Sequence, residues 1–148
     1  METLQQRKTV LLVEDSPSDV FLTTEAIKDS VADPRIFTVR DGEAALDFLY
    51  RRGDHADAPR PDIIILDINL PKMSGFQVLQ EMNRDPSLEI IPVVILTTST
   101  DQDDIVRSYR LHASSYMTKP VDGARLKDAI LSFDQFWFSV VDLPILDQ

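Results

Sequence analysis

Short apolar runs, each followed by polar residues, recur along the chain and predict a series of buried β-strands. Residues 63–66 are apolar at every position, which is typical of a central parallel strand covered by helices on both faces. Similar runs occupy residues 10–13, 36–39 and 92–96, and a shorter segment at residues 115–118 completes the predicted set of strands.

Between these runs, apolar residues recur at the three- and four-residue spacing of helices. Ser16 followed by Pro17 predicts the start of the first helix, and Asp41 and Asp122 occupy capping positions before the second and last helices. A long polar loop is expected at residues 51–61. The apolar positions that define the second to fifth helices are Ala45, Leu46, Leu49, Phe76, Leu79, Met82, Ile105, Val106, Tyr109, Leu126, Ala129 and Ile130.

Five strands that alternate with five helices predict the α/β class, with a doubly wound, five-stranded parallel sheet. The 148 residues, 43% of them hydrophobic, match the length of one ordinary domain. We therefore expect a single domain over residues 1–148, with no second folded unit.

Composition narrows the range of partners. The 25 acidic and 15 basic residues give a formal net charge of -10, which disfavours direct nucleic-acid binding. No apolar run approaches the length of a membrane span, and the lack of cysteine excludes disulfides and thiolate chemistry. These features fit a cytoplasmic protein without membrane contact.

Chemically useful side chains follow four of the predicted strands. Glu14 and Asp15 come after the first strand and Asp67 after the third, while Thr97 and Lys119 follow the fourth and fifth. In an open parallel sheet, ligands bind beyond the carboxyl ends of the strands, so these side chains are expected at one site.

This inventory suits phosphoryl transfer. Carboxylates about 4 Å apart repel by roughly 4 kcal/mol at an effective dielectric of 20, so the cluster calls for a cation such as Mg²⁺. Lys119 can neutralise one phosphoryl oxygen and the Thr97 hydroxyl can bond another. Asp67 is then free to attack, and the product would be an aspartyl phosphate.

With these residues the chain resembles the CheY-like receiver domains of bacterial response regulators, over about residues 8–135. The resemblance rests on the acidic pair after the first strand, on Asp67 with residues 70–75 behind it, on Thr97, and on Tyr116 with Lys119 and Pro120. It implies the flavodoxin-like strand order 2-1-3-4-5, in the numbering of the five strands along the chain.

The resemblance also implies roles for individual residues. Asp67 accepts a phosphoryl group from a histidine kinase. Asp15, Asp67 and the backbone carbonyl of Asn69 bind Mg²⁺, and Glu14 contributes through water. Lys119 contacts the phosphoryl group, often beside a cis peptide bond to Pro120. Thr97 moves toward the phosphate and Tyr116 turns inward, which couples phosphorylation to the face formed by the last two helices and the last strand.

Residues 51–54, residues 111–113 and the aromatic tail are similar to a narrower group, the stand-alone regulators paired with bacterial and cyanobacterial phytochrome kinases. That group has no output domain and resembles proteins that dimerise through the face that includes the last helix. The interface candidates are Phe133, Phe136, Trp137 and Phe138. At helical spacing, Phe136 and Phe138 would lie outside the core face of the last helix. A homodimer that covers them is the simplest interpretation, and a tail folded back on its own domain is the alternative.

Three other functions compete with a phosphorylated switch. A small phosphatase with an aspartate nucleophile would need a second acid two residues after Asp67, where this chain has Asn69. A flavin carrier of the same sheet order would need amide donors where this chain has acids after the first strand. A receiver-like scaffold that acts without phosphorylation remains open. We expect a protein that is not an enzyme beyond its own phosphorylation and dephosphorylation.

Overall fold

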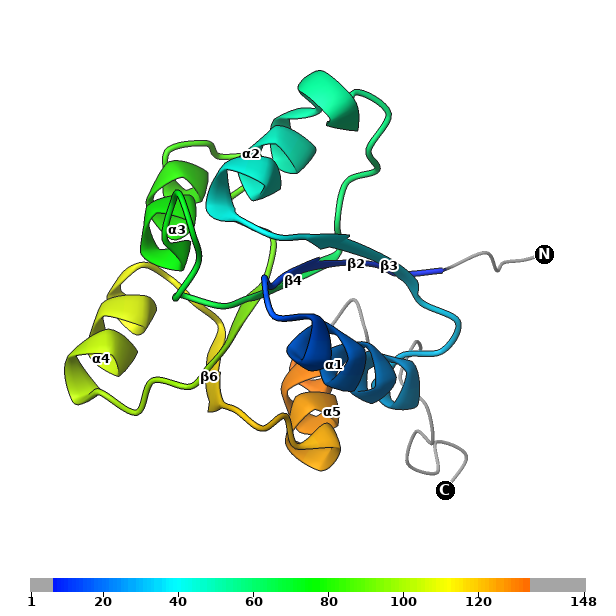
Figure 1. Cartoon of the computed structure of the whole chain (residues 1–148), viewed down its shortest axis with the longest axis vertical. Coiled ribbons are helices and arrows are strands. Elements are labelled where there is room, and N and C mark those ends of the chain that lie inside the picture. The colour runs from blue at the N-terminus through cyan, green and yellow to red at the C-terminus, as the bar shows by residue number, and fades with distance from the viewer. Residues whose placement is uncertain (1–6, 134–148) are drawn as a thin grey trace.

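A computed structural model describes residues 7–133, in which five strands alternate with five α-helices (Figure 1). The strands are β2 (Thr9–Val13), β3 (Arg35–Val39), β4 (Ile63–Leu66), β5 (Val93–Thr97) and β6 (Ser115–Thr118). The helices are α1 (Pro17–Ser30), α2 (Gly42–Tyr50), α3 (Gly75–Asn83), α4 (Gln102–Arg110) and α5 (Gly123–Leu131). The strands pair in parallel in the order β3-β2-β4-β5-β6, which confirms the predicted fold class and strand order.

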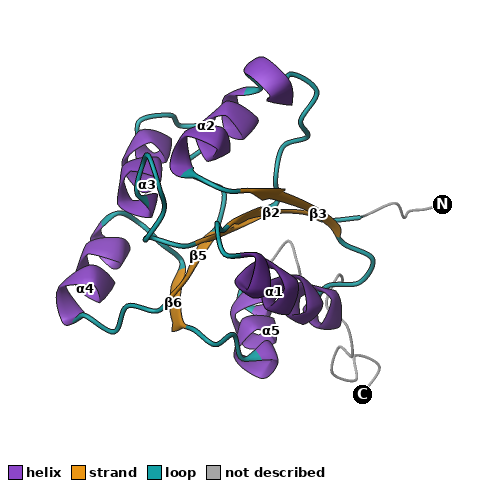
Figure 2. Ribbon diagram, in the orientation of Figure 1, coloured by secondary structure: helices purple, strands orange, loops and turns teal. Residues whose placement is uncertain are grey.

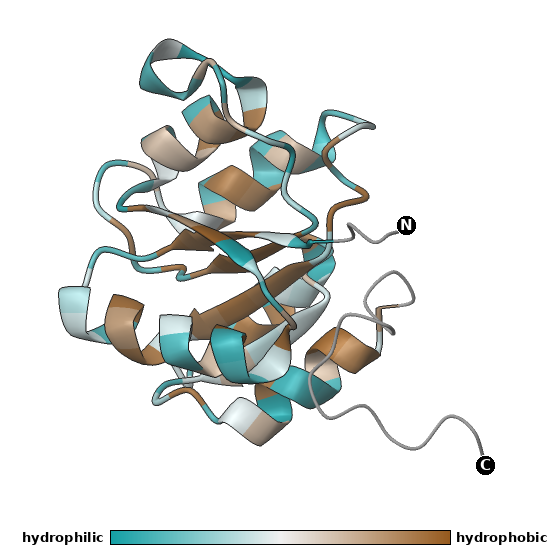
Figure 3. Cartoon of the chain, turned by 90° about the vertical axis from the view of Figure 1, so that its right-hand side faces the viewer, coloured by the Kyte–Doolittle hydropathy of each residue, from teal (hydrophilic) through white to brown (hydrophobic). Residues whose placement is uncertain are grey.

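The helices cover both faces of the sheet and leave the strands between two hydrophobic layers (Figure 2). Successive side chains of a strand point to opposite faces, so Leu11 and Val13 pack with α2 and α3 while Val10 and Leu12 pack with α1 and α5. Figure 3 shows strands that are mostly hydrophobic, between helices that carry both hydrophobic and hydrophilic residues. The apolar runs are therefore buried on both sides, as expected of central parallel strands.

Side-chain caps hold the first turns of the helices where the sequence places them. Ser16 accepts a hydrogen bond from the Asp19 amide, and Asp41 accepts one from the Ala44 amide. At α3, Ser74 and Gln77 form a reciprocal capping box. These caps lie on the edge of the sheet where the strands end, so they fix the starts of helices that border the site.

No helix in the stretch from residue 7 to residue 133 has both the length and the apolar character needed to cross a membrane.

Two local details differ from the sequence pattern. In α4, Val106 is 39% and Tyr109 is 49% exposed, and Ser108 is the buried residue instead. These side chains are exposed because α4 lies against β6, the edge strand of the sheet, where there is little surface for the helix to cover. The polar loop after α2 also contains a short 3₁₀-helix, η1 (Gly53–His55), and the His55 ring packs 5.5 Å from the Phe48 ring.

Candidate functional site

The expected site residues meet at one edge of the sheet because the parallel strands end there together. Val13 pairs with Leu66 in adjacent strands, so the acids that follow β2 and β4 are neighbours. Thr97 at the end of β5 pairs with Thr118, directly before Lys119. The structure therefore brings together the residues selected from four separate strand ends.

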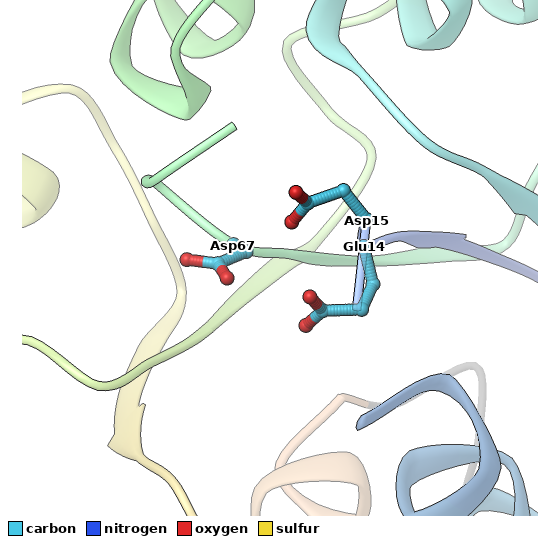
Figure 4. Close-up of side chains that lie close together, drawn as sticks. All are labelled: Glu14, Asp15 and Asp67. Carbon is cyan, nitrogen blue, oxygen red and sulfur yellow. The ribbon is translucent and has the colours of Figure 1, made fainter. Parts of the chain in front are cut away.

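Three carboxylates form the acidic side of this site. One oxygen each from Glu14, Asp15 and Asp67 lie within 4.8 Å of one another. Figure 4 shows the Glu14 and Asp15 side chains extending toward Asp67 from the end of the neighbouring strand. Asp67 is 6% and Glu14 is 2% exposed, whereas Asp15 is exposed. Two of the three charges are thus buried, and a buried charge needs a partner.

Lys119 supplies that partner. Its ammonium Nζ lies 2.7 Å from Glu14 Oε1, 2.9 Å from Asp67 Oδ2 and 3.0 Å from Asp19 Oδ2. Burial alone would lower the pKa of Lys119, but hydrogen bonds to the three carboxylates outweigh it and raise this pKa above its ordinary value. Burial also raises the pKa of Glu14, against the opposing effect of Lys119. The ammonium is therefore held in its charged form.

A chain of hydrogen bonds runs from Asp67 toward β5. The Asn69 amide N–H donates to Asp67 Oδ1 at 2.9 Å, and the Asn69 side-chain amide donates to Thr97 Oγ1 at 3.3 Å. Thr97 is fully buried, and its hydroxyl oxygen also accepts the Ser99 amide at 3.5 Å. The Thr97 hydroxyl thus stands between the acidic site and the loop that leads to α4.

Tyr116 contacts the same loop from β6. Its hydroxyl donates to the Ser99 carbonyl at 2.9 Å, and its ring packs partly buried against the core of the α2 and α3 side. Burial, together with the negative charges of Asp104 and Asp101, raises the pKa of Tyr116. The tyrosine is half-buried, and its hydroxyl is hydrogen-bonded to the backbone two residues after Thr97.

The donor set fits a divalent cation. Carboxylate oxygens from Glu14, Asp15 and Asp67 converge on one space, and such hard oxygen ligands suit Mg²⁺ or Mn²⁺.

The peptide bond between Lys119 and Pro120 is cis, as the resemblance implied.

Sequence reasoning missed one member of the site. Asp19, in the first turn of α1, reaches Lys119 although a hundred residues separate them in sequence. A signal was available in the sequence, because α1 begins where β2 ends, so its first turn has to lie at the same edge of the sheet as the other acids.

Among the interface candidates, Phe133 is half-buried just after α5. Phe136, Trp137 and Phe138 lie outside the described residues, so their predicted role stays a prediction.

The sequence profile described as "Response regulator receiver domain" matches residues 10–131 of the chain. The protein "Response regulator Rcp1" from Synechocystis sp. is 44% identical over 137 residues, which cover 93% of this chain and 93% of Rcp1. The match thus extends over nearly the whole of both chains.

Solved structures agree with these sequence matches. The phosphorylated cyanobacterial phytochrome response regulator RcpA superposes with a TM-score of 0.76 at 41% identity, over 92% of this chain and 99% of RcpA. The Mn²⁺-bound form of Rcp1 gives a TM-score of 0.75 at 43% identity, over 93% of this chain and 99% of that structure.

Proposed function

The chain belongs to the response regulator receiver family, and on that premise we propose that it is a switch phosphorylated on Asp67 by a histidine kinase. The observation that carries this proposal is the position of the Asp67 carboxylate. It lies at the end of the central strand β4, within hydrogen-bonding distance of Lys119 and beside the carboxylates of Glu14 and Asp15.

In the proposed reaction, an oxygen of Asp67 attacks the phosphorus of a phosphohistidine in line with the P–N bond. The new bond joins that oxygen to phosphorus, the P–N bond breaks, and its electron pair returns to the imidazole of the partner. Lys119 holds a phosphoryl oxygen through its ammonium, and the Thr97 hydroxyl can turn toward another.

We assign the cation role to Mg²⁺, held by Asp15, Asp67 and the Asn69 carbonyl, with Glu14 acting through water. When bound, the cation neutralises charge on the phosphoryl oxygens. Convergent carboxylate oxygens in this chain and the Mn²⁺-bound form of its relative Rcp1 support this assignment.

The signal is proposed to leave the site through Thr97. If its hydroxyl turns to the phosphoryl group, the Ser99 amide loses its acceptor at Thr97 Oγ1. The Ser99 carbonyl holds the Tyr116 hydroxyl, so movement of this loop reaches β6 and the adjacent α4. The output is a change of surface for protein–protein contact, and no reaction on another substrate is proposed.

Relatives suggest the partner. RcpA is described as a phytochrome response regulator, and we propose a phytochrome-type histidine kinase as the phosphoryl donor here. The cysteine-free composition fits a reducing cytoplasm, where we place the protein. A homodimer through the face that includes α5 is part of the proposal. Phosphotransfer from a panel of purified kinases tests the pairing, which a consistent preference for kinases of another class would contradict.

Asp67→Asn tests the central proposal. With Mg²⁺ and acetyl phosphate, the native protein should gain the mass of one phosphoryl group, and beryllium fluoride should shift the NMR signals of Tyr116. Asn lacks the nucleophilic carboxylate, so this variant should show neither effect. Asp54→Asn, the same change at an exposed residue of η1, is the matched control and should behave as the native protein.

A native protein that gains no mass and shows no shift at saturating donor and mimic would leave the alternative of a scaffold that works without phosphorylation. The phosphatase alternative predicts steady release of phosphate from added phosphate esters. Asn69 has no acid proton to give to a leaving group, so we expect none.

A further inference from the structure

Lys119 has a contact that the proposed function does not use. Its ammonium touches Glu14 and Asp67, which belong to the phosphorylation site, and also Asp19 Oδ2 at 3.0 Å. Asp19 comes from α1, not from a strand end. The Lys119 side chain is only 9% exposed, so the three carboxylates surround an ammonium that is nearly withdrawn from water.

Helix capping does not account for the Asp19 side chain. The capping bond at α1 uses the backbone amide of Asp19, which donates to Ser16 Oγ at 3.4 Å. An acid in the first turn interacts favourably with the helix dipole in any orientation toward solvent. This carboxylate instead points an oxygen at the buried ammonium, which is the contact that needs a separate explanation.

The number of donors decides what happens when a phosphoryl group arrives. An ammonium has three N–H donors, and Glu14, Asp67 and Asp19 provide an acceptor for each of them. A phosphoryl oxygen can bond Lys119 only if one carboxylate yields its place.

The carboxylate that yields most easily is Asp19. Its side chain is 31% exposed, against 2% for Glu14 and 6% for Asp67, so it loses the least on turning back to water. Asp67 itself becomes the phosphorylated group, and Glu14 is almost fully buried and would have no water to turn to.

We propose that Asp19 is a positioning residue that occupies the third donor of Lys119 in the unphosphorylated protein and competes with the phosphoryl group for it. The inference rests on the proposed phosphorylation of Asp67. Asp19 thereby weakens the hold of Lys119 on anionic phosphoryl groups and lowers the occupancy of the phosphorylated form at a given donor concentration.

Asp19→Asn removes the charge but keeps the shape and the capping amide. This variant should bind beryllium fluoride, in the presence of Mg²⁺, about tenfold more tightly than the native protein, which corresponds to about 1.4 kcal/mol. Asp19→Glu restores a carboxylate and should return the affinity toward the native value. Asp29→Asn is the matched control: it makes the same change on the same helix, roughly 15 Å further along its axis, and should shift the affinity less than twofold.

The direction of the rate change separates competition from a structural effect. Near neutral pH, acetyl phosphate and phosphoramidate both present a PO3 group with two negative charges and differ in the leaving group. In both reactions Asp67 gains the phosphoryl group and the bond from phosphorus to the leaving group breaks, releasing acetate or ammonia. Competition for Lys119 therefore predicts that Asp19→Asn speeds phosphorylation by both donors, whereas structural damage from the loss of the contact between Asp19 and Lys119 would slow both.

The outcomes distinguish this inference from its premise. If the native protein is phosphorylated on Asp67 but Asp19→Asn matches it in affinity and in both rates, or binds the mimic more weakly, the role of Asp19 is wrong and the proposed function stands. If the native protein neither binds the mimic nor gains a phosphoryl group, the proposed function fails and the inference fails with it.

Discussion

At residue 75, a side chain would collide with the backbone that carries the proposed phosphoacceptor. An ideal Cβ added to Gly75 would lie 2.5 Å from the Asp67 carbonyl oxygen and 2.7 Å from the Ile68 Cα atom. The Gly75 amide also donates to the Ile68 carbonyl at 3.1 Å. Glycine is required here because the first turn of α3 rests directly on the Asp67 loop.

Gly75→Ala should therefore lower the free energy of unfolding by about 1–3 kcal/mol, the usual cost of forcing extra volume into a packed site. It should also slow phosphorylation, because the backbone at Asp67 has to shift. Urea denaturation and the rate of mass gain with acetyl phosphate measure the two effects.

Gly123→Ala is the matched control, since Gly123 also begins a helix but an added Cβ there meets nothing within 4 Å. It should leave the stability unchanged or raise it by about 0.4–1 kcal/mol through a smaller loss of chain entropy. Equal effects of the two substitutions would contradict the argument from close packing.

Among the elements, α3 and α4 have the same length but different attachment to the core. Each spans nine residues, yet α3 buries Phe76, Val78, Leu79 and Met82, whereas the residue that α4 buries is Ser108. The stability of α4 therefore depends on few apolar contacts, although its capping residue Asp101 accepts a bond from the Asp103 amide. A helix held in this way can change position at little cost.

Amide hydrogen exchange of the unphosphorylated protein should therefore show lower protection in α4 than in α3, because local opening costs less where little apolar surface is buried. The comparison is internal, since both helices have nine residues and lie in the same molecule. NMR-detected exchange measures it residue by residue. Protection of α4 at the level of α3 would argue against α4 as the element that responds to phosphorylation.

At the scale of the whole molecule, charge opposes self-association. Two copies that each carry a formal net charge of -10 repel one another, and salt screens this repulsion over about 8 Å at physiological ionic strength. A homodimer therefore needs an apolar contact. In the sequence, Phe136 and Phe138 are the aromatic residues that we predict for such a contact.

Light scattering at several protein concentrations should give a mass that rises toward that of a dimer, and added salt should strengthen the effect. The double variant Phe136→Ser and Phe138→Ser should shift the protein toward the monomer. Ile90→Ser removes an apolar side chain that is 71% exposed in the loop before β5 and should leave the mass unchanged. A monomer at every concentration, with and without beryllium fluoride, would contradict the dimer.

Much of the fold could be predicted because the signals are local. Each strand is a short apolar run, and caps such as Ser16 and Asp122 mark the first turns of helices. The main site residues could also be selected, since the carboxyl ends of parallel strands meet at one edge of the sheet. The exposed face of α4 could not be predicted, because residues such as Val106 and Tyr109 have the helical spacing whether or not a neighbouring surface covers them.

By itself, the sequence determined the class of fold and placed Asp67 among acids, a lysine and a threonine. Which atoms meet was decided only by the tertiary structure. The Lys119 ammonium contacts Asp19, a hundred residues away in sequence. The Tyr116 hydroxyl donates a hydrogen bond to the Ser99 carbonyl, and Gly75 packs directly against the Asp67 backbone. The physical reason is that periodicity and capping act over a few neighbouring residues. Hydrogen bonds and close contacts, by contrast, depend on the placement of whole helices and strands to within a few tenths of an ångström.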